Sequence, residues 1–168
     1  MKKIVSLCAA AALLLASCSE SRKAGKIAVI PAPVHMESGL GDFILDKATV
    51  VAYPAGDSVL ARAGGMISET LGATFGTALA LSPDTLSGAI VLERPETPAG
   101  LKPEGYRMAV SPDRIAIETN DYNGAFYALQ TLLQLLPAEV YSAGDNGPAE
   151  NVFDDGGGFI IPEGVELE

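Results

Sequence analysis

Hydrophobic and polar positions alternate and then change period along residues 105–137, GYRMAVSPDRIAIETNDYNGAFYALQTLLQLLP. Apolar residues occupy every second position in 106–110 and again in 115–117, which is the pattern of half-buried strands. The tetrapeptide Ser111-Pro112-Asp113-Arg114 lies between them, and its proline and aspartate favour a tight turn. This stretch therefore predicts two strands paired as an antiparallel hairpin.

A helix is predicted directly after the hairpin. Asn120 or Asp121 can cap it by accepting backbone N–H bonds, and Pro137 ends it. Apolar residues recur within it at steps of three and four, and they are expected to pack on the sheet: Phe126, Leu129, Leu133 and Leu136. An earlier amphipathic helix is predicted to begin at Asp57 or Ser58. Its apolar face consists of Leu60, Ala63, Ile67, Leu71 and Phe75.

Short strands surround these helices in the prediction, over residues 39–46, 48–53, 78–81, 89–93 and 159–162. Residues 27–33 contain two prolines and should run extended along an edge, and residues 138–158 are rich in Gly, Asp, Asn and Pro and should be loop. The pattern predicts an α+β fold in which both helices cover one face of a mainly antiparallel sheet. Continuous apolar runs at 50–52 and 89–92 indicate that the other face is covered too.

The N-terminus carries the signature of export. Lys2 and Lys3 precede an apolar run that is too short to span a bilayer as a helix. Leu15-Ala16-Ser17-Cys18 resembles the lipobox of bacterial lipoproteins, which implies removal of residues 1–17 and lipid modification of Cys18. A plain signal peptide cut nearby is the alternative. Residues 18–26 would then form a polar tether, and we expect a lipid-anchored protein of the cell envelope, on its periplasmic or surface face.

Charge and composition narrow the possible partners. Acidic residues outnumber basic ones by 21 to 11, and the net charge of −10 argues against binding to nucleic acid or to an anionic lipid surface. We therefore expect membrane contact through the lipid. Cys8 lies in the segment that export would remove, so the exported chain would hold Cys18 alone and have no internal disulfide.

The residues present give no catalytic, cofactor-binding or metal-binding assignment. His35 is the single histidine, no Gly-x-Ser-x-Gly motif accompanies it, and we expect it to be solvated or on an edge strand. Asp154 and Asp155 precede three glycines but lack the spacing of a calcium loop, so a glycine-rich loop is the preferred interpretation. The glycines also do not form a nucleotide-binding motif.

Carboxylates and aromatic residues are the remaining candidates for binding groups. Glu93, Glu96, Glu104 and Glu118 are expected to form a solvated rim. Tyr122, Phe126 and Tyr127 could offer a platform on which a sugar ring stacks. The preferred interpretation places Phe126 in the core and the two tyrosines at its rim.

Three motifs in this chain resemble the N-terminal domain of glycoside hydrolase family 20 β-N-acetylhexosaminidases. They are Ile30-Pro31-Ala32-Pro33, the strand start Glu104-Gly105-Tyr106, and the helix motif G-x-F-Y-x-x-Q-T-L-x-Q-L over residues 124–135. The resemblance implies an α+β domain, sometimes likened to zincin proteases, with an antiparallel sheet and two helices on one face. The family domain would occupy residues 27–137.

The resemblance also implies where catalysis takes place. In the family, an Asp-Glu pair in a following (β/α)₈ barrel works with the acetamido group of the substrate, and the glutamate is the general acid. Neither residue is present in this chain, so residues 138–168 are interpreted as loop and strand leading to a missing catalytic barrel. We expect an accessory domain of a lipid-anchored β-N-acetylhexosaminidase that is inactive alone. A stand-alone envelope lipoprotein that binds a glycan or a protein partner is the alternative.

Overall fold

The computed structural model describes residues 28–37, 42–83, 88–138 and 141, and the backbone of residues 159–162 and 166–167. The strands are β1 (Met36–Glu37), β2 (Asp42–Leu45), β3 (Val50–Ala52), β4 (Ala80–Ser82), β5 (Ala89–Glu93), β6 (Tyr106–Val110), β7 (Arg114–Thr119), β8 (Phe159–Pro162) and β9 (Glu166–Leu167). The long helices are α2 (Ser58–Gly72) and α3 (Tyr122–Leu135), with short 3₁₀ turns η2 (Ala73–Phe75) and η3 (Pro98–Gly100).

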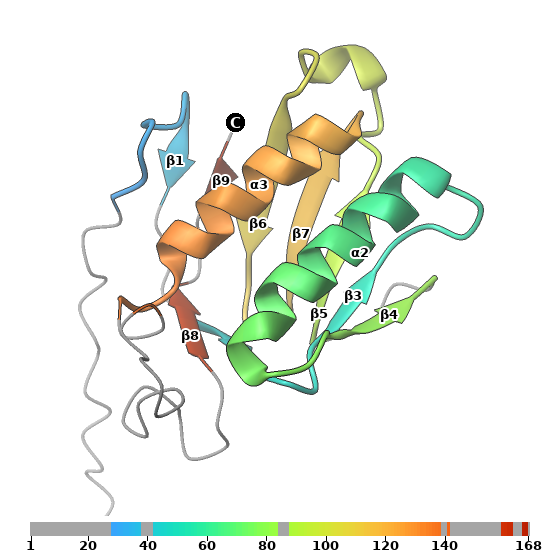
Figure 1. Ribbon diagram of the computed structural model, residues 1–168. Helices are drawn as coiled ribbons and strands as arrows, with labels where there is room; N and C mark the ends of the chain where they lie inside the picture. The colour runs from blue at the N-terminus through green and yellow to red at the C-terminus, as the bar shows by residue number, and fades with distance from the viewer. Residues whose placement is uncertain are drawn as a thin grey trace, which may run out of the picture.

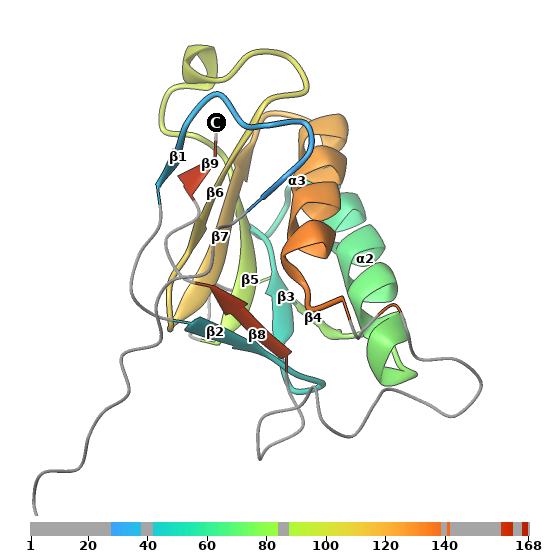
Figure 2. The ribbon, with the colours of Figure 1, turned by 90° about the vertical axis from the view of Figure 1, so that its left-hand side faces the viewer.

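The fold is α+β, as predicted, with a seven-stranded sheet in the order β1-β9-β6-β7-β5-β3-β4 and a two-stranded sheet of β2 and β8. Both α2 and α3 lie on the same face of the large sheet (Figures 1 and 2). The main core fills the space between this face and the helices, where Leu60, Ile90, Ile117 and Leu129 are among the buried residues.

The sheet is mixed, and the prediction of a mainly antiparallel sheet is wrong. Strands β7, β5, β3 and β4 pair in parallel, whereas β6 pairs antiparallel with β7 and with β9. The reason lies in α2, which crosses from the end of β3 back to the start of β4, so the two strands run the same way. The continuous apolar runs of β3 and β5 are typical of such buried parallel strands.

The predicted hairpin and its following helix are confirmed. Strand β6 pairs with β7 from Tyr106 opposite Thr119 to Val110 opposite Ile115. At the turn, the Ser111 backbone N–H donates to the Arg114 carbonyl over 2.9 Å, and the Ser111 hydroxyl donates to the same oxygen over 2.9 Å. This tight turn fixes the register of β6 and β7, the two strands on which α3 packs.

Helix α3 contacts the sheet through small residues, and one residue that was predicted to be in the core is exposed. Ala125, Ala128 and Leu129 are buried on the sheet side, Leu136 is buried after the helix end, and Leu133 is partly buried. Phe126 is 41% exposed, so the prediction that it packs in the core is wrong. Its position is one residue beyond Ala125, about 100° further around the helix, because a helix makes a turn every 3.6 residues.

The earlier helix follows its prediction closely. Leu60, Ala63, Ile67 and Leu71 are fully buried, and Phe75 packs against the core from η2 rather than from α2 itself. A Cβ atom added at Gly64 would lie 3.2 Å from Tyr53 Cδ1, so this glycine allows a close approach of α2 to the sheet. No helix among the described residues combines the length and the hydrophobicity that crossing a bilayer requires.

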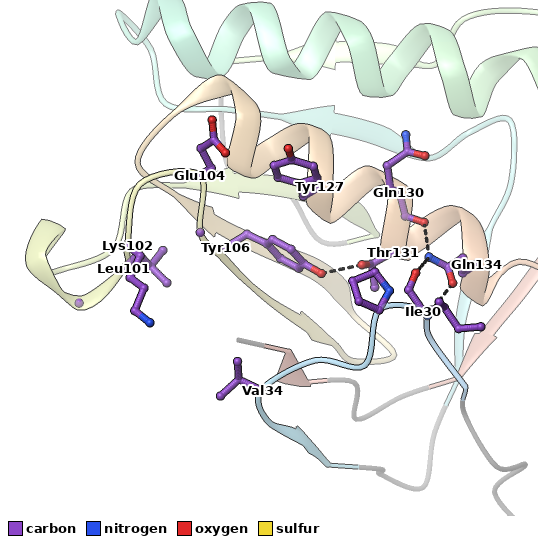
Figure 3. Close-up of a pocket in the computed structure, with 13 residues that line it drawn as sticks. Ile30, Val34, Leu101, Lys102, Glu104, Tyr106, Tyr127, Gln130, Thr131 and Gln134 are labelled. Atoms are coloured by element: carbon purple, nitrogen blue, oxygen red, sulfur yellow. Dashed lines mark hydrogen bonds between the residues drawn. The ribbon is translucent and has the colours of Figure 1, made fainter.

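The two ends of the described chain meet at one edge of the large sheet. β1 pairs with β9, with Met36 opposite Leu167, and Leu167 also lies opposite Met108 of β6. The sequence pattern did not predict β1 or β9. Strand β8 was predicted, and it pairs with β2. Residues 27–33 were expected along a sheet edge; the described residues 28–33 instead run beside α3, where Ile30 makes the hydrogen bonds detailed below (Figure 3).

Candidate functional site

A pocket of about 460 Å³ lies between the N-terminal arm (residues 28–35), the loop of residues 100–105 and one side of α3 (Figure 3). Three segments that are far apart in the sequence therefore build it. Its lining consists of Ile30, Pro31, Val34, Gly100, Leu101, Lys102, Glu104, Gly105, Tyr106, Tyr127, Gln130, Thr131 and Gln134. Most of the surface these residues present is apolar.

Gln134 fastens the N-terminal arm to α3. Its side-chain Oε1 accepts the Ile30 backbone N–H at 2.8 Å, and its Nε2 donates to the Ile30 carbonyl at 3.0 Å. The amide thus pairs with both backbone groups of one residue, as a neighbouring strand would. This pairing holds Ile30 and the adjoining Pro31 as one wall of the pocket.

Tyr106 forms part of the pocket wall that the sheet supplies. It is the first residue of β6, and its hydroxyl lies 2.5 Å from the Thr131 hydroxyl of α3. The polar tip of the tyrosine is therefore satisfied by the helix, while its ring is left facing the pocket (Figure 3). The strand start and the helix are tied together at this point.

Asp121 joins the 100–105 loop to the start of α3. Its Oδ1 accepts the Gly124 N–H at 2.8 Å as the helix cap, and its Oδ2 accepts the Glu104 N–H at 2.9 Å. Burial acts to raise the pKa of Asp121, but the backbone donors Gly124 and Glu104 outweigh it, so the pKa is lowered. Glu104 has a left-handed backbone, with φ of 65°, and accepts a hydrogen bond from Asn123 at 2.8 Å.

Arg94 links the starting ends of both helices. Its Nε and Nη2 donate to the two carboxylate oxygens of Asp57 at 2.7 and 2.9 Å, and its Nη1 donates to the Asn120 carbonyl. Asp57 also caps α2 by accepting the Val59 and Leu60 N–H groups at 3.1 and 3.0 Å. The hydrogen bond from Arg94, with help from these backbone donors, lowers the pKa of Asp57.

The lowered pKa of Asp57 predicts an acid-dependent contribution to stability. A depressed folded-state pKa stabilises the fold above the unfolded value, about 3.9, and this contribution disappears as the pH falls through the folded-state pKa. Asp57→Asn keeps a capping side chain but loses the charge, so its deficit against the parent chain should be largest near neutral pH and vanish in acid. Asp57→Ala should lose about 1 kcal/mol more at every pH, because the cap is gone.

Urea unfolding of the parent chain, Asp57→Asn and Asp57→Ala between pH 3 and pH 7 measures these differences. Asp46→Asn is the matched control. The Asp46 Oδ1 accepts the Ala48 and Thr49 N–H groups in a turn, and this carboxylate has no arginine partner among the described residues. A deficit of Asp57→Asn that does not change with pH would contradict the role of the Arg94 pair.

The predicted carboxylate rim is only partly a solvated one. Glu93 pairs with Arg114 at 3.2 Å and Glu118 pairs with Arg107 at 3.3 Å, and all four side chains are partly exposed. Glu96 is exposed, and Glu104 lines the pocket. Within the pocket lining, Glu104 is the one carboxylate, whereas glycoside hydrolysis ordinarily uses a pair.

The remaining predicted positions fall outside this pocket. His35 is solvated as expected, with a side chain 53% exposed and 3.3 Å from Glu37. Among the described residues, no three His, Cys, Asp or Glu side chains gather where a metal ion could be held. Cys18, Asp154 and Asp155 lie outside the described residues.

Tyr122 lies at the rim of the core as predicted, whereas Phe126 and Tyr127 are exposed. Tyr122 is partly buried beneath Arg62, whose guanidinium carbon lies 4.4 Å from the ring centre. Phe126 and Tyr127 contact each other edge to face, with centroids 5.6 Å apart, and both are exposed. Tyr127 therefore lies in the pocket lining and not at the rim of the core, where it was predicted.

Sequence reasoning did not assemble the pocket. The residues that α3 contributes to the pocket recur at steps of three and four: Tyr127, Gln130, Thr131 and Gln134. They form a polar and aromatic stripe beside the apolar stripe of the same helix. That spacing is the signal that could have indicated a second functional face on α3.

The structure is that of an α+β module, and the lining of its pocket contains a single carboxylate, that of Glu104. The model of glycosyl hydrolase family 20, domain 2, matches residues 26–155. The chain belongs to this family, as the resemblance of its motifs indicated.

Named relatives agree with this assignment. A beta-hexosaminidase of Porphyromonas gingivalis is 30% identical over 146 residues, which is 82% of this chain and 18% of the relative. The GH20 beta-N-acetylhexosaminidase of Streptomyces coelicolor A3(2) is 25% identical, with a TM-score of 0.59, and the match covers 83% of this chain and 26% of that one. The beta-N-acetylhexosaminidase of Bacteroides fragilis NCTC 9343 shares the fold at 23% identity, with a TM-score of 0.55 over 83% of this chain and 24% of that one. The chain thus spans about a fifth to a quarter of these relatives.

Proposed function

We propose that this chain is the accessory N-terminal domain of a β-N-acetylhexosaminidase that removes terminal N-acetylhexosamine residues from glycans. The observation that carries the proposal is the family match over residues 26–155 together with 30% identity to a beta-hexosaminidase. The accessory role is supported by the pocket, whose lining provides one carboxylate rather than the two that such hydrolysis requires.

Hydrolysis in this proposal takes place in a (β/α)₈ barrel carried by the same polypeptide. A glutamate there protonates the leaving oxygen, and an aspartate orients the acetamido group of the substrate, which attacks the anomeric carbon. The configuration at that carbon is retained because two displacements occur. The accessory domain contributes a folded platform beside the barrel and no reacting group.

The proposal includes export and a lipid anchor on Cys18. It rests on the lipobox-like Leu15-Ala16-Ser17-Cys18 after a short apolar run, and on residues 18–26 as the tether. The acidic net charge of −10 disfavours electrostatic binding to an anionic leaflet, so the lipid would hold the protein at the envelope.

One preparation tests these statements together. The polypeptide that carries this chain is purified in detergent from the cells that make it, and its intact mass is measured before it is assayed on a chromogenic N-acetylglucosaminide. We expect a mass well above that of the 168-residue chain, a lipidated N-terminal cysteine, and hydrolysis of the N-acetyl substrate but not of the matching glucoside. Equal hydrolysis of the glucoside would contradict the substrate-assisted mechanism.

Exposed apolar residues favour the accessory domain over the stand-alone module. Ile30 and Val34 border the pocket and are 81% and 92% exposed, and Tyr127 is 45% exposed. A self-contained binding module would be expected to cover such a group with its own polar surface. An apolar patch beside a pocket is what a domain that packs against another domain presents.

A further inference from the structure

The N-terminal arm is attached to the domain at its first residues and is exposed beyond them. Val29 is buried in the main core, and both backbone groups of Ile30 pair with the Gln134 amide. Val34 is 92% exposed, and no hydrogen bond joins residues 31–35 to another element among the residues that the structure describes. The position of the second half of the arm therefore depends on what holds β1, which follows it.

Within the described residues, β9 is the one strand that pairs with β1. The order β1-β9-β6 places β9 between β1 and the rest of the large sheet (Figures 1 and 2). Met36 lies opposite Leu167, and Leu167 lies opposite Met108 of β6. Neighbouring strands are about 4.8 Å apart, so β1 is about 9.6 Å from β6 and cannot form hydrogen bonds with it directly.

The contact between β1 and β9 is short. It spans two residue pairs, and both residues of β1, Met36 and Glu37, are exposed. The register also places two acidic residues at opposed positions, Glu37 and Glu166, and like charges at such positions destabilise a strand pair. A segment with few buried contacts opens at a small free energy while the core stays folded.

The arm also forms one wall of the pocket. Ile30, Pro31 and Val34 line it, and Val34 precedes β1 by two residues. Gln134 holds Ile30 whether or not β9 is in place, whereas the next attachment after Val34 is the pairing of β1 with β9. The wall thus has one part that α3 fixes and one part that depends on β9.

We propose that β9 is a latch for the N-terminal arm. When β9 lies beside β6, β1 pairs with it and Val34 closes one side of the pocket. When β9 leaves the sheet, residues 32–37 are released and the pocket opens at Val34, while Ile30 stays bound to α3. The pairing of residues 166–167 thus controls a pocket whose lining residues lie between 30 and 134 in the sequence. The inference uses contacts within this chain alone and does not depend on the hexosaminidase assignment.

Amide hydrogen exchange of the 168-residue chain, resolved by residue with NMR, tests this inference. Leu167→Pro removes a backbone N–H from a residue that lies between β1 and β6, and proline is not tolerated in the middle of a sheet. We expect residues 32–37 to exchange about ten times faster in this variant, whereas the Ile30 N–H keeps its rate. Strand β7 serves as the internal control, because it pairs with β5 and β6.

Two results of this experiment would overturn the inference. One is equal exchange of residues 32–37 in the parent chain and in Leu167→Pro. The other is loss of protection at Ile30 together with residues 32–37 while β7 stays protected, because the arm would then be released as a whole.

A change of charge at Glu37 tests the latch without altering the backbone of β9. Glu37→Lys places opposite charges at the opposed positions and should slow the exchange of residues 32–37 about two- to five-fold at low salt. Glu37→Gln removes the like-charge pair without adding an attraction, so its exchange rate should lie between those of the parent chain and the lysine variant.

Asp42→Lys is the matched control for this change. It alters the net charge by the same amount, but the residue opposite Asp42 is Pro162 of β8, so the exchange of residues 32–37 should stay at the rate of the parent chain. Faster or unchanged exchange of residues 32–37 in Glu37→Lys would overturn the inference, and so would equal slowing in Asp42→Lys.

Discussion

Replacing Gly124 by alanine is expected to destabilise the domain by about 3 kcal/mol, at the upper end of the usual overpacking range. A Cβ atom at this position would come closer than 3.0 Å to the Thr119 hydroxyl and to the Gly105 carbonyl oxygen. Neither atom can withdraw easily, because the Thr119 hydroxyl donates to Gly105 O at 3.1 Å and the Gly105 carbonyl is backbone. The helix would have to lift from the hairpin.

Gly65→Ala is the matched control for this substitution. Gly65 is also in a helix interior, but a Cβ atom there meets nothing within 4 Å, so alanine should stabilise the domain by about 0.5–1 kcal/mol. Urea unfolding of both variants measures the difference. Gly124→Ala with the stability of the parent chain would contradict the close packing of α3 on β6 and β7.

The second large effect is expected at Leu129, and its comparison with Phe126 separates the observed core from the predicted one. Leu129 is 1% exposed, so Leu129→Ala should cost about 2–5 kcal/mol through lost burial and a cavity. Phe126→Ala should cost about 1 kcal/mol or less in the 168-residue chain, because that ring is 41% exposed. The comparison uses urea midpoints at constant slope. A larger loss at Phe126 than at Leu129 would contradict the exposed position of the Phe126 ring.

The local elements were predictable because their determinants are close together in the sequence. Pro112-Asp113 sets the hairpin turn, Asp57 and Asp121 are both among the predicted caps, and the periodicity of α2 identifies its buried face. The face of α3 was harder to predict. Ala125 and Ala128 form its contact with the sheet, and small residues weigh little in a pattern of large apolar ones.

The arrangement of strands could not be predicted in the same way. A parallel pair depends on a crossover such as α2, and β1 meets β9 across most of the chain, with Glu37 opposite Glu166. Two-residue strands have no period to detect. The continuous apolar run of β5 is typical of a buried parallel strand, but it fits any sheet that is covered on both faces, so it does not by itself distinguish parallel from antiparallel pairing.

The residues of the candidate site belong to motifs that the sequence shows, but their assembly into one pocket could not be predicted from the sequence. The motifs around Ile30, Tyr106 and Gln130 were recognised separately by their resemblance to the family. Their convergence on one pocket depends on the Gln134 pairing with Ile30 and on the Tyr106–Thr131 contact, which link positions up to 104 residues apart. Separation of this size leaves no local trace in the sequence.

The central claim is that this domain supports hydrolysis without performing it. The most direct test measures release of the chromophore from an N-acetyl-β-glucosaminide by the purified 168-residue chain, beside an equal molar amount of the complete polypeptide. The complete polypeptide should turn over the substrate, and the chain alone should give no release above buffer. Release by the chain alone, in proportion to its concentration, would contradict the claim.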